Sequence, residues 1–159
     1  MNFRIGFGFD VHQLKEGLDF WLGGIIIPHI KGGFGHSDAD VLIHAICDAL
    51  LGAANLGDIG KHFPDTAAEY KGIDSKILLK KVMVLIRNNG YEIGNIDSTI
   101  CLQNPKIGPH IQEMKKVLAI CMDIDVDQVS IKATTTEKLS FVGREEGVSA
   151  YATVLIKKN

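Results

Sequence analysis

Near its start the sequence places an aspartate and a histidine two residues apart, as Asp10 and His12. In a strand, side chains two residues apart point to the same side, so a carboxylate and an imidazole would face one point. His44 lies in a later apolar segment and could supply a third ligand. Two imidazoles and a carboxylate suit a zinc ion that keeps one coordination position open. The pattern therefore predicts a zinc site.

Each of these residues also has a purely structural interpretation. A single Asp-x-His pair is a weak signal, and a histidine in an apolar helix is more often a core residue. Asp40 and Asp48 lie four residues on either side of His44, and either could accept the imidazole N–H and orient the ring. Asp40 could instead only cap the helix. The zinc hypothesis gains weight only from the other polar segments.

The segment Gly-His-Ser-Asp at residues 35–38 precedes the apolar helix expected to contain His44. The start of a helix offers free N–H groups and positive potential to a phosphate. His36 could add a hydrogen bond or a positive charge. Ser37 could contact phosphate or serve only as the helix cap, and the local sequence leaves both open.

Hydroxyl groups and a carboxylate gather in Thr-Thr-Thr-Glu, residues 134–137, directly after an expected strand. Such a group could bind phosphate oxygens and a hard cation such as magnesium. The alternative is a capping box from Thr134 to Glu137.

The proline-bracketed loop at residues 103–109 could recognise the edge of a nucleotide base through its backbone amides, or it could be only a rigid turn. Arg144 is either an anion contact or part of a surface ion pair.

Periodicity predicts the elements that position these residues. Strands are expected at residues 3–9, running into Asp10, and at 20–27, 92–102, 129–133 and 148–156. Helices are expected from a Ser37 cap with Asp40 as its partner to Ala54, from residue 74 or 75 to Asn89, and at 109–122. Residues 56–71 read as a long loop, often a functional feature. The order predicts an α/β (α+β) fold, with one domain over residues 1–159 forming a layered sandwich of one mixed sheet with helices.

Composition narrows the class of protein. The chain has 159 residues, 46% hydrophobic and 23% charged, which is typical of a folded globular domain. Its formal net charge of -2 argues against a general nucleic-acid binder. We find no signal peptide and no segment apolar enough to span a membrane, and the three scattered cysteines predict buried free thiols, so a cytoplasmic location is expected.

Taken in order, four segments resemble one family over nearly the whole chain: RIGFGFDVH, GHSDADVLIHAICDALLGAANLGDIGKHFPDT, NIDSTICLQNPKIGPHI and IKATTTEKLSFVGREEG. The sequence is similar to the 2-C-methyl-D-erythritol 2,4-cyclodiphosphate synthases of the non-mevalonate route to isoprenoids. The resemblance implies a phosphorus-oxygen lyase that converts 4-diphosphocytidyl-2-C-methyl-D-erythritol 2-phosphate to the cyclic diphosphate and CMP. Ala67, Ile107, Gly108, Ser140 and Val142 differ from the residues usual in the family.

The resemblance also implies residue roles. Zinc would be held by Asp10, His12 and His44, and phosphate would be contacted by His36, as a catalytic residue, and Ser37. Ribose and methylerythritol would be bound by Asp58, Ile59, Gly60, Phe63, Pro64, Asp65, Thr66 and Ala67, with Val11 as a further substrate contact. Cytosine would be bound by the backbone of Leu102, Gln103, Asn104, Pro105, Lys106, Ile107 and Gly108. The diphosphate would be bound by Thr134, Thr135, Thr136 and Glu137, with Thr135 catalytic and Glu137 on Mg²⁺ or Mn²⁺.

Finally, the resemblance implies a ring-shaped homotrimer with active sites between subunits. Phe141 and Arg144 would face a central cavity, where an isoprenoid diphosphate is a possible ligand. Two other functions stay open from the residues alone. One is a zinc-dependent phosphohydrolase that uses the same three ligands to activate water, and the other is an isoprenoid-diphosphate-binding module.

Overall fold

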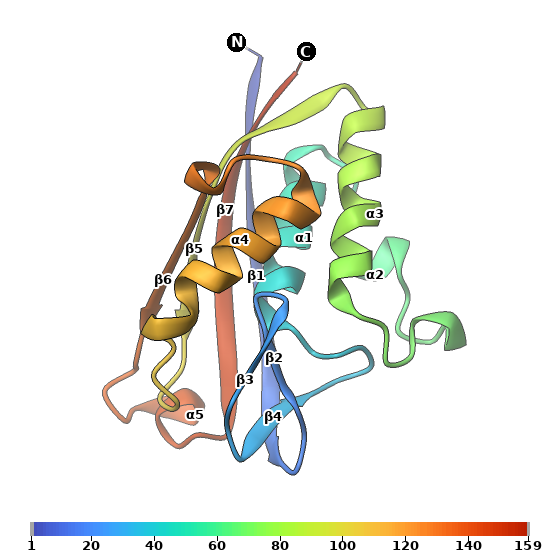
Figure 1. Ribbon diagram of the computed structural model, residues 1–159. Helices are drawn as coiled ribbons and strands as arrows, with labels where there is room; N and C mark the ends of the chain where they lie inside the picture. The colour runs from blue at the N-terminus through green and yellow to red at the C-terminus, as the bar shows by residue number, and fades with distance from the viewer. Residues whose placement is uncertain (1, 159) are drawn as a thin grey trace.

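The computed structural model describes residues 2–158 and contains the mixed sheet that the sequence predicts. Its five strands stand in the order β4-β1-β7-β5-β6 (Figure 1). They are β1 (Phe3–Glu16), β4 (Lys31–Phe34), β5 (Tyr91–Cys101), β6 (Val129–Thr134) and β7 (Gly147–Lys158). Neighbours are antiparallel except β5 and β6, which are parallel. The strands β1, β5 and β6 therefore run in one direction.

Three long helices, α1 (Val41–Ala53), α3 (Ser75–Asn88) and α4 (Ile111–Met122), build the core together with one face of the sheet. Helix α1 is buried on nearly every side because it lies between β1, β7 and α3. On the sheet, Ile96 and Ile100 of β5 and Val148, Ala152 and Val154 of β7 are buried against the helices. These alternate positions confirm the period-two pattern predicted for both strands.

The helix-facing side of β1 carries glycines instead of apolar side chains. A Cβ atom built on Gly6 would lie 1.9 Å from the carbonyl oxygen of Ala49, and one on Gly8 would lie 1.9 Å from that of Ala45. The backbone of α1 therefore rests directly on the strand, which only glycine permits. Asp10 and His12 follow on the same face of β1, toward the start of α1.

The other face of β1 is apolar and exposed in this chain. Phe3, Ile5, Phe7 and Phe9 are between 44% and 72% exposed. The ring of Phe9 lies 5.1 Å from the ring of Tyr151 on β7, so the apolar surface continues onto the neighbouring strand. A contiguous surface of this kind is a feature of protein–protein interfaces.

Two predicted elements are wrong in detail. Residues 20–27 form a hairpin of β2 (Phe20–Leu22) and β3 (Ile25–Ile27), because Gly23 and Gly24 adopt positive φ and turn the chain. The glycine-rich segment after it, residues 31–34, pairs with the end of β1 as strand β4. The predicted loop 56–71 contains the short helix α2 (Ile59–His62) and a 3-10 turn (Ala68–Tyr70).

The predicted cap of α1 is also wrong. Asp40, not Ser37, is the N-cap, because Ala39 has a φ of 58° and breaks the helical path before it. The Asp40 carboxylate accepts hydrogen bonds from the backbone N–H of Ile43, Gly23 and Gly24 at 2.7–3.0 Å. This buried carboxylate therefore fastens the β2–β3 turn to the start of α1. Burial raises the pKa of Asp40.

The remaining elements are short. They are the 3-10 turns Gly108–His110 and Val126–Gln128 and the helix α5 (Ser140–Gly143). The three cysteines are free, as predicted, but only Cys47 is fully buried. Among residues 2–158, no helix is both long and apolar enough to cross a membrane.

Candidate metal centre and active site

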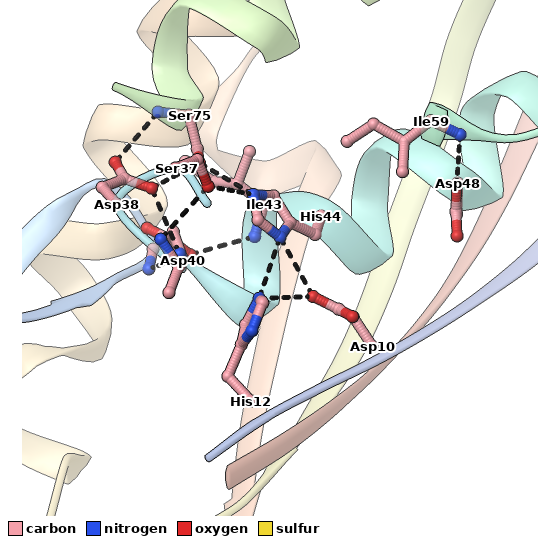
Figure 2. A network of polar contacts seen from close by, with 12 residues as sticks. Asp10, His12, Ser37, Asp38, Asp40, Ile43, His44, Asp48, Ile59 and Ser75 are labelled. Atoms are coloured by element: carbon pink, nitrogen blue, oxygen red, sulfur yellow. Dashed lines mark hydrogen bonds and ion pairs between the residues drawn. The ribbon is translucent and has the colours of Figure 1, made fainter. Parts of the chain in front are cut away.

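Asp10, His12 and His44 converge on one point between β1 and α1 (Figure 2). Asp10 Oδ2 lies 3.0 Å from both His12 Nε2 and His44 Nδ1, and the two nitrogens are 3.1 Å apart. The ligands of one tetrahedral zinc ion stand about 3.3 Å apart, since each Zn–ligand bond is about 2.0–2.1 Å long. The donor types and their spacing therefore fit a metal ion with three protein ligands.

The two ionisable partners shift each other's pKa. Burial raises the pKa of Asp10, but hydrogen bonds and charge from His12 and His44 outweigh it and hold that pKa well below its usual range. Burial lowers the pKa of His44, but the hydrogen bond and charge of Asp10 outweigh burial and raise it. In the metal-free protein these shifts favour an ionised Asp10 carboxylate beside a protonated His44 ring.

The other ring nitrogen of His44 contacts two serine hydroxyls. Nε2 lies 2.9 Å from Ser75 Oγ and 3.1 Å from Ser37 Oγ. Neither Asp40 nor Asp48, the two partners considered from the sequence, contacts this nitrogen, and the alternative of a capping role for Asp40 is confirmed. Asp40 caps α1, and Asp48 accepts the backbone N–H of Ile59 at 2.8 Å. Asp48 therefore holds the start of α2 against α1.

A pocket of about 380 Å³ opens beside His12 and His44. It brings together most of the residues predicted from the first half of the chain: His36, Ser37, Ile59, Gly60, Phe63, Pro64 and Asp65. Asp58 lies next to it as the N-cap of α2, where its side chain accepts the N–H of Lys61 at 2.9 Å. Ala67 accepts a hydrogen bond from His36 Nε2 at 3.3 Å, while Thr66 is exposed.

Three further lining residues, Tyr70, Ile73 and Leu78, are missing from the sequence-based set. Tyr70 ends the 3-10 turn after α2, Ile73 lies in the segment that follows, and Leu78 lies in the first turn of α3. No local pattern predicts how these residues pack. Their side chains make one wall of the pocket largely apolar. A mainly apolar pocket with a few polar side chains suits a ligand that combines charged groups with a carbon skeleton.

The residues predicted from the second half of the chain form a separate group at the ends of β5 and β6. Leu102 donates its N–H to the carbonyl of Thr134 at 3.0 Å, and the side chain of Gln103 accepts the N–H of Lys138 at 3.2 Å. The side chain of Asn104 donates to that of Glu145. Within the described residues 2–158, no residue of 102–108 or 134–137 lines the pocket beside His44.

The capping box predicted at Thr134 and Glu137 is absent from the described chain. Thr134 ends β6, Glu137 has a φ of 53°, and α5 begins only at Ser140. Thr135 Oγ1 accepts the N–H of Glu137 at 3.3 Å and lies 3.5 Å from its carboxylate. The hydroxyl and the carboxylate therefore project together from an exposed turn.

Sheet register gives the separation of the two groups. Val11 pairs with Ser149, Ser149 with Cys101, and Cys101 with Thr134, so these residues form one row across four strands. Three steps of about 4.8 Å put Val11 about 14 Å from Thr134. A single diphosphate does not span that distance. Within one chain, the backbone beside Asp10 and His12 and the backbone at the start of the threonine turn therefore lie about 14 Å apart.

Phe141 and Arg144 lie on and after α5. Phe141 shares a shallow hollow with Val11, His12 and Gly147. Arg144 forms a two-pronged ion pair with Glu146, at 3.0 and 3.1 Å. Of the two interpretations of Arg144, the surface ion pair is the one present in this chain.

Comparison with known proteins agrees with this geometry. The YgbB family model matches residues 3–157. The chain is 68% identical over 158 residues to the 2-C-methyl-D-erythritol 2,4-cyclodiphosphate synthase of Bacteroides fragilis, and the alignment covers 99% of each chain. It is 64% identical over 154 residues to the synthase of Porphyromonas gingivalis, covering 97% of this chain and 95% of that one.

The chain belongs to the YgbB family. Solved structures agree in fold: the bifunctional IspDF of Campylobacter jejuni matches with a TM-score of 0.95 and 42% identity over 99% of this chain and 42% of that one. A 2-C-methyl-D-erythritol 2,4-cyclodiphosphate synthase in a bound form with CDP matches with a TM-score of 0.89 and 37% identity over 97% of this chain and 100% of that one. The protein is an enzyme with the cyclodiphosphate synthase activity of the methylerythritol phosphate pathway.

Proposed function

We propose that the enzyme converts 4-diphosphocytidyl-2-C-methyl-D-erythritol 2-phosphate to 2-C-methyl-D-erythritol 2,4-cyclodiphosphate and CMP. An oxygen of the 2-phosphate attacks the β-phosphorus, a P–O–P bond forms, and the bond to the α-phosphate breaks as CMP leaves. The observation that carries this proposal is the convergence of Asp10, His12 and His44 beside a pocket whose rim holds His36 and Ser37.

The metal centre would hold zinc through Asp10, His12 and His44. Zinc bound there would supply Lewis-acid polarisation of a phosphoryl oxygen. His36 and Ser37, at the rim, would donate hydrogen bonds to phosphate oxygens, and His36 would stabilise the charge that develops in the transition state. Ile59, Phe63 and Asp65 would hold the methylerythritol skeleton, with Asp58 and Gly60 on ribose. Because the reaction joins two anions, charge neutralisation and in-line positioning are the main tasks of the protein.

Cytosine would be bound by the backbone of residues 102–108, and the diphosphate by residues 134–137. The turn of Thr135 and Glu137 offers hard oxygen ligands suited to Mg²⁺ or Mn²⁺, which would neutralise the diphosphate. The hydroxyl of Thr135 would donate a hydrogen bond to the reacting phosphoryl group. The relative solved in a bound form with CDP supports a cytidine diphosphate ester as the substrate.

The two half-sites would meet between neighbouring subunits of a ring-shaped homotrimer. The backbone separation of about 14 Å within one chain supports this arrangement, because a neighbouring subunit would bring a second half-site closer. The exposed apolar face of Phe3, Ile5, Phe7 and Phe9 offers a surface for the assembly. A ring of identical subunits uses a head-to-tail contact, so each site takes one half from each of two neighbours.

A zinc phosphohydrolase is the competing enzymatic function. It would need the three ligands but neither the cytosine loop nor the threonine turn. An isoprenoid-diphosphate-binding module would need a free cation at Arg144, and here Glu146 occupies that guanidinium. Binding of an isoprenoid diphosphate in a central cavity would therefore require this ion pair to open.

The proposed reaction is tested by removing the internal nucleophile. Purified enzyme with zinc and Mg²⁺ should release CMP from the 2-phosphorylated ester. It should release none from 4-diphosphocytidyl-2-C-methyl-D-erythritol, which lacks the 2-phosphate. Nucleotide chromatography measures both rates. Equal CMP release from the two esters would mean that the 2-phosphate is not the nucleophile.

Zinc affinity should fall as the pH is lowered. The pKa of His44 is raised, so its proton must be displaced before Nδ1 can bind metal. The loss should begin above pH 6.5, the ordinary His value, and reach about tenfold per pH unit for one displaced proton. Chelator competition over a pH series measures this dependence. An affinity that stays constant down to about pH 6 would contradict a protonated His44 in the metal-free enzyme.

Glu137→Gln should weaken activation by Mg²⁺ or Mn²⁺ and leave zinc content unchanged. The substitution removes a carboxylate charge from the threonine turn but lies outside the Asp10, His12 and His44 cluster. The concentration of Mg²⁺ for half-maximal activity should rise by about tenfold or more. Glu92→Gln, at the start of β5 and so at the far end of that strand from the cytosine loop, is the control. An unchanged activation curve would leave Glu137 without a role in metal binding.

A further inference from the structure

Ser75 is a fully buried serine at the first position of α3, and its hydroxyl contacts a metal-facing histidine. Ser75 Oγ lies 2.9 Å from His44 Nε2 (Figure 2). The opposite ring nitrogen, Nδ1, faces Asp10 and His12. A neutral imidazole carries its single proton on one nitrogen only. For Nδ1 to offer its lone pair to a metal, the proton must sit on Nε2 and be donated away from the cluster.

Asp38 determines which way the Ser75 hydroxyl points. One carboxylate oxygen of Asp38 accepts the Ser75 hydroxyl proton, and the other accepts the Ser75 backbone N–H at 2.9 Å. An ionised carboxylate is only an acceptor, so the serine proton is committed to Asp38. The lone pairs of Ser75 Oγ are then free to accept the Nε2–H of His44. The chain of donors runs from His44 to Ser75 to Asp38.

Ser37 approaches the same nitrogen but in a different environment. It is partly exposed and lines the substrate pocket, where a phosphate would compete for its hydroxyl. Ser75 is removed from solvent and cannot be reached by the substrate in this way. A further hydrogen bond joins Asp38 to the segment before α3, because the backbone N–H of Asp38 donates to the carbonyl of Ile73 at 3.1 Å. The segment that contains Tyr70 and Ile73 forms one wall of the pocket and therefore leads directly into Ser75, whose hydroxyl contacts His44.

We propose that Ser75, oriented by Asp38, is a positioning residue that fixes His44 with its proton on Nε2 and its Nδ1 lone pair toward the metal. This inference rests on the metal-binding role proposed above for His44. Partners of this kind set both ring orientation and ligand basicity, and their loss typically costs 10–100-fold in metal affinity. Sequence inspection places Ser75 only at a helix start, so it gives no indication of this role.

The test is Ser75→Ala in the full chain, measured with zinc alone. The zinc dissociation constant from chelator competition should rise by about 10–100-fold. Ser98→Ala is the matched control, because Ser98 is also buried and hydrogen-bonded, to the carbonyl of Ser130 at 2.8 Å, but lies outside the cluster. The control should bind zinc as the unmodified chain does. Equal losses in both variants would mean general destabilisation and would overturn the proposal.

Nitrogen NMR of histidine-labelled protein separates positioning from simple structural support. In the zinc-loaded unmodified chain, His44 should give a protonated Nε2 whose hydrogen exchanges slowly with solvent. In Ser75→Ala that hydrogen should exchange much faster, even at saturating zinc. An unaltered Nε2–H signal together with unchanged zinc affinity would overturn the proposal. If the unmodified chain itself bound no zinc through His44, the proposed function would fail first, so the two failures are distinguishable.

Discussion

Replacing His44 with alanine should remove the metal from the enzyme and abolish its activity. The substitution leaves only Asp10 and His12 at the cluster, and two ligands do not hold zinc against solvent. Since losing a partner behind a ligand costs 10–100-fold, losing a ligand should weaken zinc binding by more than about 100-fold. Elemental analysis of the purified variant measures zinc content, and CMP release measures activity.

A second histidine gives the control for this variant. His29 lies away from the cluster, where its ring contacts Phe20 at a centroid distance of 6.3 Å. His29→Ala should keep about one zinc per chain, as a three-ligand site predicts. Full zinc occupancy in His44→Ala would refute the assignment of this cluster as the metal centre.

Mixing two impaired variants should restore activity if the active site is shared between subunits, when activity is measured at a Mg²⁺ concentration too low to activate Glu137→Gln alone. His44→Ala damages the metal half-site and Glu137→Gln damages the diphosphate half-site. In randomly mixed trimers, each half-site of a given active site is intact with a chance of about one half. About a quarter of the sites should then be complete, because the two halves come from different chains. Activity of the co-expressed mixture should approach that fraction of the unmodified level.

The control mixture combines two variants that damage the same half-site. His44→Ala co-expressed with Asp10→Ala should recover no activity, because every metal half-site then lacks a ligand. Native mass spectrometry of tagged chains verifies that mixed trimers form. Mixed trimers of the first pair without recovery would place both half-sites in one chain, against the separation of about 14 Å that the sheet register implies.

Much of the fold follows from sequence because local rules and long-range packing agree there. Helix α3 has a clear cap at Asp74 and an end at Asn89. Strand β5 alternates buried Ile96, Ser98 and Ile100 with partly exposed neighbours, as its pattern predicts. In these two elements, the cap residues and the alternation of buried positions are visible in the local sequence itself.

Strand β1 illustrates that a local sequence pattern does not determine which face of a strand is packed against a helix. Its apolar residues, Phe3 to Phe9, resemble a core face, yet they are exposed, and Gly6 and Gly8 face the helix instead. Only the close approach of α1 makes the glycine side the packed one. The start of α1 is similar, because the positive φ of Ala39 and the β2–β3 turn select Asp40 as the cap.

The candidate site divides in the same way. Residue types and the resemblance predict the cluster of Asp10, His12 and His44, and the structure brings these side chains together. The contacts behind them were not predictable, since Ser75 is 31 residues from His44 in sequence. The pocket wall of Tyr70 and Ile73 depends on how a turn without apolar periodicity folds over His36. These contacts exist only after the tertiary structure has formed.

The most direct test of the proposed reaction is its product in water enriched in heavy oxygen. Zinc-loaded enzyme with Mg²⁺ and the 2-phosphorylated cytidine diphosphate ester should give a cyclic diphosphate and CMP, neither carrying the label. Internal attack forms the new P–O–P bond from an oxygen already in the substrate. Mass spectrometry of both products reads the outcome. Labelled CMP, or a linear bisphosphate carrying one heavy oxygen, would mean that water attacked and would contradict the proposed cyclisation.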